Sequence, residues 1–361
     1  MRKNINQLIL FLFLSSCSTT AFLKYEKESE LRQNKEFEKQ VVVKPTEEVA
    51  PESVPVGPQS PPKVDTPIVT DKASVLTTAL NKKAEVPKVS RKKNKKNQDL
   101  AKVAEVKPVV RQPELENSEG FNGQRRPAVD PYRVGEKVVH SVRYFAAEAG
   151  QLTLEVKPFV QVNDKKSYNF LIALQTSSLF SKFYSVDDYV ETYMDYENMV
   201  PHVFKLNVRE TGKLSQANSY FDHNALKARY WEKKYTQKNG EEIIKKEWDL
   251  QTFSQNAFSG IFYMRIFNWK IGQQYSFRVA DDEKNVVFKG TALQKEHIST
   301  EAGEFDAIKI KADIFSRGAL TQAGNLYFWI SDDDRKYVLK IEAEIKIGKL
   351  ISEVIEIKPG N

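Results

Sequence analysis

Apolar and polar residues alternate along most of the chain from Val134 onward, which is the pattern of half-buried β-strands. The predicted strands are 138–144, 152–156, 168–175, 185–195, 202–209, 217–222, 228–236, 241–249, 274–279, 286–297, 305–315, 325–330, 338–347 and 350–357. Because short turns connect these segments, we expect a mostly β fold. A curved antiparallel meander or barrel-like sheet is the architecture that so many strands adopt.

Glycines mark two of the predicted hairpins. Gly150 lies between the first two strands. Lys238-Asn239-Gly240 predicts a tight turn, because Asn-Gly accepts the positive φ angles that such turns require.

One segment, 254–267, interrupts the alternation and predicts the inserted helix. Phe258, Phe262 and Ile266 recur at helical spacing, and Ser254 can cap the amino end. Such a helix packs on one face or plugs one mouth of a curved sheet, or else it lines a ligand cavity.

Four aromatic residues are candidates for lining such a cavity: Phe258, Phe262, Trp231 and Trp248. Aromatic side chains line apolar pockets, and they also pair across neighbouring strands. Both interpretations remain open on the sequence.

Composition divides the chain unequally. Ten of the fifteen prolines precede Arg126, whereas all four tryptophans follow Tyr132. A proline-rich stretch with few aromatics cannot offset its ordering entropy by burial. We therefore expect residues 17–127 to form a disordered tether rich in Pro, Lys and Glu, with a reach of roughly 60 Å. Residues 128–361 are expected to form one β-rich globular domain.

The formal charge of +7 belongs to the first 129 residues, most of it to the tether, because the chain from Asp130 onward holds 32 Lys and Arg against 32 Asp and Glu. The excess includes a basic cluster of Arg91, Lys92, Lys93, Lys95 and Lys96. In an exported protein this cluster could contact an anionic envelope polymer or lipid headgroups, or merely keep the linker solvated. Nucleic acid is not an expected partner.

The amino terminus predicts export and lipidation. A positive start and an apolar run at 8–14, too short to span a bilayer, are typical of a secretory signal. Leu14-Ser15-Ser16-Cys17 resembles the bacterial lipobox, in which the cysteine carries diacylglycerol. We expect removal of residues 1–16 and a lipid anchor on Cys17. Ser18 favours the outer membrane, with the domain in the periplasm.

Histidine and aspartate patterns do not predict a metal site. The four histidines, His140, His202, His223 and His297, lie on different predicted strands without zinc-site spacing. The run Asp332-Asp333-Asp334 lacks the spacing and glycine of a calcium loop, and its place between two strands predicts a hairpin turn.

Catalytic motifs are equally weak. Asp187, Asp188, Glu191 and Asp195 alternate irregularly along one predicted strand, and the sequence does not fix the separation that a glycosidase pair needs. Ser259 lacks the first glycine of a nucleophile elbow, and glycine-rich phosphate loops are missing. We expect no enzymatic activity and no cofactor.

Four segments in the same order resemble a known family: 187–195, 199–204, 258–265 and 329–333. Together they are similar to exported Gram-negative proteins grouped as domain of unknown function 3108. The resemblance extends from about Pro131 to Lys358. It implies a curved antiparallel β domain with an inserted helix in an envelope protein, and it implies no activity or catalytic residues.

These patterns favour a non-enzymatic, outer-membrane-anchored lipoprotein whose sheet binds an apolar or amphipathic envelope ligand, or a protein partner. This hypothesis predicts a lined cavity or an exposed apolar patch. One alternative is a cell-wall-associated scaffold that uses the basic cluster. Another is a hydrolase of envelope glycan or lipid, which requires a carboxylate pair or a Ser-His pair in one cleft.

Overall fold

The computed structural model describes residues 34–46, 126–127, 129–145, 147–316, 319–320, 324–345 and 348–361. Its helical elements are short: α3 (Lys35–Glu38), η2 (Phe180–Lys182), α4 (Ser259–Tyr263) and η3 (Met264–Ile266). Within these ranges, none of the helices has the length and apolar character needed to cross a membrane.

Strands make up most of the described residues. The first nine are β1 (Val43–Pro45), β2 (Glu136–Tyr144), β3 (Ala147–Val162), β4 (Lys165–Thr176), β5 (Asp187–Asp195), β6 (Pro201–Glu210), β7 (Lys213–Asp222), β8 (Lys227–Thr236) and β9 (Gly240–Asp249). The remaining strands are β10 (Gln274–Asp281), β11 (Lys284–Thr300), β12 (Gly303–Ser316), β13 (Ala319–Leu320), β14 (Leu326–Ser331), β15 (Val338–Ile345) and β16 (Gly348–Pro359).

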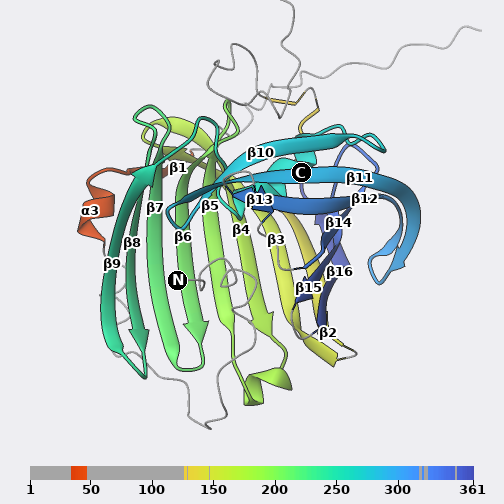
Figure 1. Cartoon of the computed structure of the whole chain (residues 1–361), viewed down its shortest axis with the longest axis horizontal. Coiled ribbons are helices and arrows are strands. Elements are labelled where there is room, and N and C mark those ends of the chain that lie inside the picture. The colour runs from red at the N-terminus through yellow and green to blue at the C-terminus, as the bar shows by residue number, and fades with distance from the viewer. Residues whose placement is uncertain are drawn as a thin grey trace, which may run out of the picture. The chain divides into compact units, whose positions relative to one another are not determined.

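All strands belong to one 16-stranded sheet with antiparallel pairing between strands. Its order is β10-β11-β12-β14-β15-β16-β2-β3-β4-β5-β6-β7-β8-β9, with β1 added to β3 and β13 to β12. Strands β10 to β12 run across the upper part of the sheet at a steep angle to β5 to β9 (Figure 1). The predicted fold class, a mostly β, curved antiparallel meander with an inserted helix, is confirmed.

The two ends of this strand order, β9 and β10, are linked by the segment that follows β9. Gln255 forms a parallel bridge with Val279 of β10. Its amide donates to the Arg278 carbonyl at 2.8 Å, and its carbonyl accepts from the Ala280 amide at 2.8 Å. β9 and β10 do not pair with each other, so the sheet remains open between them. The irregular backbone around Gln255 spans this gap.

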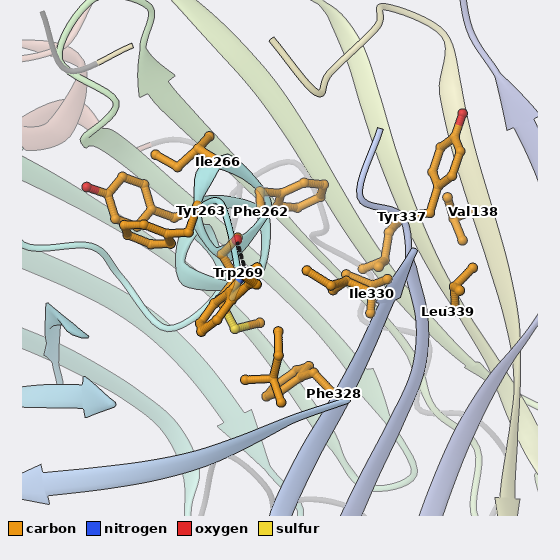
Figure 2. Packing of buried hydrophobic residues seen from close by; sticks show 14 of the residues in the cluster. Val138, Phe262, Tyr263, Ile266, Trp269, Phe328, Ile330, Tyr337 and Leu339 are labelled. Carbon is orange, nitrogen blue, oxygen red and sulfur yellow. Dashed lines mark hydrogen bonds between the residues drawn. The ribbon is translucent and has the colours of Figure 1, made fainter. Parts of the chain in front are cut away.

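The concave side of the sheet holds the main hydrophobic core. Phe262 of α4 stacks on Phe170 of β4 with ring centroids 4.1 Å apart, and Trp269 donates a hydrogen bond to the Met264 carbonyl at 2.9 Å. Figure 2 shows Phe262 on the side of the helix towards Ile330 of β14 and Tyr263 on the other side; both belong with Trp269 to one buried cluster. The helix thus completes the core by packing against both halves of the sheet.

The helix is shorter than the sequence predicts. It begins at Ser259, not after Ser254, and its first amides are satisfied by Asn256, whose Oδ1 accepts from Phe258 N at 2.9 Å and Ser259 N at 2.7 Å. The prediction was wrong about the start because the backbone of Gln255 is engaged with β10 and cannot adopt helical dihedrals.

Two predicted turns are confirmed and one is wrong. Gly240 has φ +69° at the β8–β9 turn, and Asp333 lies in the β14–β15 turn, where its Oδ1 accepts from two backbone amides. Gly150, however, lies inside β3, and the turn comes earlier, between Tyr144 and Ala147. Gly150 is needed there because a Cβ would lie 2.1 Å from the Gln175 carbonyl oxygen.

The prediction of a disordered tether is wrong for residues 34–46. Within this range α3 and β1 pack on the sheet, because Phe37 and Val41 find an apolar surface far away in the sequence. The rest of the predicted tether up to 125 lies outside the described residues, as do the signal peptide, Cys17 and the basic cluster.

Candidate functional site

Residues 34–46, here named the strap, form a short helix followed by an extended segment. Asn34 starts the helix, since its Oδ1 accepts from the Phe37 amide at 3.0 Å. Phe37 and Val41 are four residues apart and therefore lie on the same side of the strap. Each is only 5% exposed. The strap is thus amphipathic, with its apolar side turned to the sheet.

The extended part of the strap adds a strand to an open edge. Strand β2 pairs with β3 only as far as Glu155, which leaves the edge at Val160–Val162 free on that side. Residues Val43–Pro45 pair antiparallel with this stretch, Val43 opposite Val162. The backbone groups that β2 does not reach are therefore used by the strap.

The surface beneath the strap is an apolar patch on the outer face of the sheet. We name it the outer-face patch; it consists of Val162, Tyr193, Val203 and Trp231, with Tyr220 beside them. Successive residues of a strand point to opposite faces, so Tyr193 points outward while its neighbour Met194 lies in the main core. Phe37 meets Trp231 edge to face, with ring centroids 6.1 Å apart.

Polar contacts surround this apolar centre. Trp231 Nε1 donates to Glu36 Oε2 at 2.9 Å, and the Glu36 carboxylate also pairs with Lys245 of β9. The hydrogen bond from Lys245, followed by that from Trp231, lowers the pKa of Glu36. Arg229 donates to Gln40 Oε1 at 2.9 Å. Side chains of β8 and β9 thus recognise both charge and amide groups of the strap.

Asn163, in the β3–β4 turn, holds the strap by its backbone. Its Oδ1 accepts from the Val42 amide at 2.8 Å and its Nδ2 donates to the Gln40 carbonyl at 3.1 Å. Its own amide donates to the Val42 carbonyl at 2.9 Å. Asn163 has φ +48°, a conformation that asparagine tolerates better than most residues. These contacts do not depend on the side chain at position 42.

A small polar pocket adjoins the strap site. It has a volume of about 150 Å³ and lies among the turns after β3 and β7 and the start of β6. Inside it, His202 Nε2 is 3.0 Å from Asp195 Oδ2. Burial opposes the charge on Asp195, but hydrogen bonds from His202 and the Asn198 amide outweigh it and lower the pKa. The volume suits a small polar molecule and is well below that of lipid-sized ligand sites.

The structure does not bring the four predicted ligand-lining aromatics together. Trp231 lies in the outer-face patch, whereas Phe262 is buried in the main core. Phe258 stacks on Phe204 with centroids 5.5 Å apart, and Trp248 packs near the open edge of the sheet. Only Trp231 thus contributes to the strap site.

The four carboxylates of β5 also go to different partners. Asp187 accepts from Gln175 at 2.9 Å, Glu191 pairs with Lys157, Asp195 pairs with His202, and Asp188 lies beside Glu210 of β6. Burial and, second, the charge of Glu210 raise the pKa of Asp188 to about 7. Tyr184 donates a hydrogen bond to Glu210 at 2.7 Å. Asp188 can therefore hold a proton near neutral pH beside the Glu210 carboxylate, a pairing that the sequence did not reveal.

No group of three or more His, Cys, Asp or Glu side chains within the described ranges is arranged to hold a metal ion. The histidines fall into three places: His140 is buried in the sheet, His297 is exposed, and His202 and His223 lie together beside the pocket, with ring centroids 6.0 Å apart.

The strap is the feature that the sequence interpretation missed. Its signals are the Asn34 cap, the spacing of Phe37 and Val41, and the β-branched run Val41-Val42-Val43. Charged and proline-rich neighbours surround these residues, and their partners lie more than a hundred positions away, so local pattern alone does not distinguish them from a linker.

Solved structures share only a distant likeness with this chain. A β-barrel-like protein of domain of unknown function DUF1849 from Brucella abortus has 9% identity and a TM-score of 0.41, covering 65% of this chain and 100% of its own. A candidate lipoprotein from Parabacteroides distasonis has 12% identity and a TM-score of 0.29, covering 64% and 99%. These likenesses are too remote to transfer a function.

No curated protein matches this chain at a significant level. The family model described as protein of unknown function (DUF3108) matches residues 139–355, which is more than half of the 361 residues. The resemblance seen in the sequence is therefore confirmed, and the chain belongs to the DUF3108 family of proteins of unknown function.

Proposed function

We propose that this chain is a non-enzymatic lipoprotein of the bacterial outer membrane, facing the periplasm, whose β domain binds a polypeptide segment on the outer-face patch. The observation that supports this is the strap itself. It occupies the patch by two modes of peptide recognition, a strand added to a sheet edge and an apolar side chain seated among aromatics.

A polypeptide suits this surface better than a free lipid does. Asn163 contacts three backbone groups of the strap, so a bound segment needs amides and carbonyls at that spacing. Lys245 and Arg229 add selectivity for acidic and amide side chains. The concave side is occupied by packed side chains such as Phe170 and Phe262, which favours the outer face as the binding surface.

The Phe37→Ala variant of the full chain should loosen the strap. Burial of a phenylalanine stabilises by about 2 kcal/mol, so the population of undocked strap should rise about 30-fold. Amide hydrogen exchange in residues 34–46 measures this. Lys35→Ala, on the exposed side of the same helix, is the matched control and should leave exchange unchanged. Equal exchange in the two variants would contradict the proposed docking energetics.

A second experiment tests binding of a separate segment. A synthetic peptide of residues 34–46 should bind the full chain carrying Phe37→Ala and Val41→Ala, because the patch is then open. It should bind the natural chain far more weakly, and adding Trp231→Ala should abolish binding. If the peptide bound none of these proteins, the outer-face patch would not be a peptide-binding surface.

The lipid anchor is tested separately. The Cys17→Ala variant should move from the membrane fraction to the soluble fraction in cell fractionation, because several acyl chains on one cysteine are lost. A variant with Arg91, Lys92, Lys93, Lys95 and Lys96 all changed to Gln is the comparison. It should stay on the membrane, and its release would point to the basic cluster as the attachment.

A further inference from the structure

Three large apolar side chains are exposed at one end of the sheet. Phe145, in the β2–β3 turn, is 70% exposed, and Leu179 and Phe183, which flank η2 between β4 and β5, are 59% and 79% exposed. The two connections adjoin, because Ser177 donates from its amide to the Ala149 carbonyl at 2.9 Å and from its hydroxyl to the Glu148 carbonyl at 3.1 Å.

These side chains are held outward by ordered backbone. In the η2 connection, the Tyr184 amide donates to the Phe180 carbonyl at 2.9 Å. The ring of Phe145 rests on Tyr144, with centroids 4.5 Å apart, and a Cβ on Gly348 would lie 3.0 Å from it. In the folded chain these apolar side chains therefore lie at the tips of two connections, exposed to water.

The shape and chemistry of these tips fit a lipid surface. Side chains that project from convex turns can enter the boundary between headgroups and acyl chains without a complementary groove. Lys182 lies between Leu179 and Phe183 in the sequence and is exposed. A lysine beside apolar residues can bury its alkyl stem while its ammonium stays among phosphates.

The length of chain before the strap is compatible with this contact. Cys17 precedes Asn34 by seventeen residues, which span at most about 60 Å when extended. The strap pairs with β3 at Val160–Val162, the end of that strand away from Phe145, and the 16-residue β3 spans about 50 Å. The reach of the seventeen residues exceeds this length, so an anchor at Cys17 lets the tips touch the membrane. The polar pocket lies at the other ends of β3 and β7 and faces away from these tips.

We infer that Phe145, Leu179 and Phe183 insert into the surface of the phospholipid bilayer that carries the anchor, so that the domain lies on the membrane with this end down. The inference rests on the proposed membrane anchoring, and it concerns a separate contact that the lipid on Cys17 does not supply.

The test uses the full chain without signal peptide and with Cys17→Ala, so that no acyl chain contributes. This protein should co-float with vesicles of phosphatidylethanolamine and phosphatidylglycerol. Changing Phe145, Leu179 and Phe183 together to Ser should lower the vesicle partition coefficient at least tenfold. Ile243, Ile271 and Leu293, which are exposed elsewhere, provide the matched control when changed to Ser together.

Each outcome is decisive. Loss of flotation in the tip variant alone, with circular dichroism unchanged, supports the inference. No flotation of the starting protein, or equal flotation of both Ser variants, overturns it. Fractionation of the lipidated chain and binding of the strap peptide are read independently, so failure here is distinguishable from failure of the proposed function.

Discussion

Replacing Arg265 by Met is expected to lower the free energy of unfolding by about 3 kcal/mol, near the lower end of the usual cost of breaking a buried ion pair, because Arg335 still pairs with Glu136 at 2.7 Å. The Arg265 guanidinium is 3% exposed and donates to both carboxylate oxygens of Glu136, at 2.6 and 3.0 Å. It also donates to the carbonyls of Pro131 and Arg335. One side chain therefore joins η3 to β2, to the start of the domain and to the β14–β15 turn.

Urea unfolding followed by tryptophan fluorescence measures the loss. The double variant Arg265→Met, Glu136→Gln should lose less than the sum of the two single variants, because both members of the buried pair are then absent and the remaining Arg335 is partly exposed. Arg143→Met, which breaks a partly exposed pair with Glu353, is the surface control and should cost less than about 1 kcal/mol. A cost for Arg265→Met as small as that of the control would contradict the role of this cluster.

Acidification from pH 7 to pH 5 should remove about 2 kcal/mol of stability through His140 alone. Burial lowers the pKa of His140 to about 4, although a hydrogen bond with Ser352 opposes this effect. The unfolded chain binds a proton near pH 6.5, whereas the folded chain does so only near pH 4. The contribution of neutral His140 to the free energy of unfolding is therefore complete above pH 6.5, and it is lost as the pH falls toward 4.

The His140→Gln variant isolates this effect. Its free energy of unfolding should fall less between pH 7 and pH 5 than that of the natural protein, by about 2 kcal/mol. Comparison of the two proteins is necessary because Asp188 and Asp281 act in the opposite direction. Burial raises their pKa values to about 7 and about 6, so both bind protons in the folded state first. Parallel pH curves for the two proteins would refute the assignment to His140.

The sheet was predictable because alternation is a local signal. The predicted strand 286–297 lies within β11, and the predicted strand 217–222 lies within β7. Alternation does not decide which face of a strand points toward the core. Trp231 was therefore correctly placed on a strand, but its direction, outward to the strap, depends on how the sheet curls.

The start of the helix and the strap depend on tertiary contacts that no local pattern contains. Gln255 pairs with β10 and is therefore not part of the helix. Phe37 packs on Trp231, which is almost two hundred residues away in the sequence. For the same reason, only part of the candidate site could be predicted. The contact between Asn163 and the strap connects a hairpin turn with a segment that the sequence assigns to the linker. Asp188 and Glu210 likewise come together only because their strands are neighbours in the sheet, which the local pattern of either strand does not show.

The docked strap also changes what a cut in the chain would do. Residues 34–46 and the domain from Arg126 are held together by the strap contacts as well as by the intervening chain. A protease that cleaves anywhere between 47 and 125 would leave two polypeptides in a noncovalent complex. Separation of the two polypeptides would then follow the dissociation rate of the strap, so Phe37 and Trp231 would set how long the cleaved domain stays joined to the part of the chain that includes Cys17.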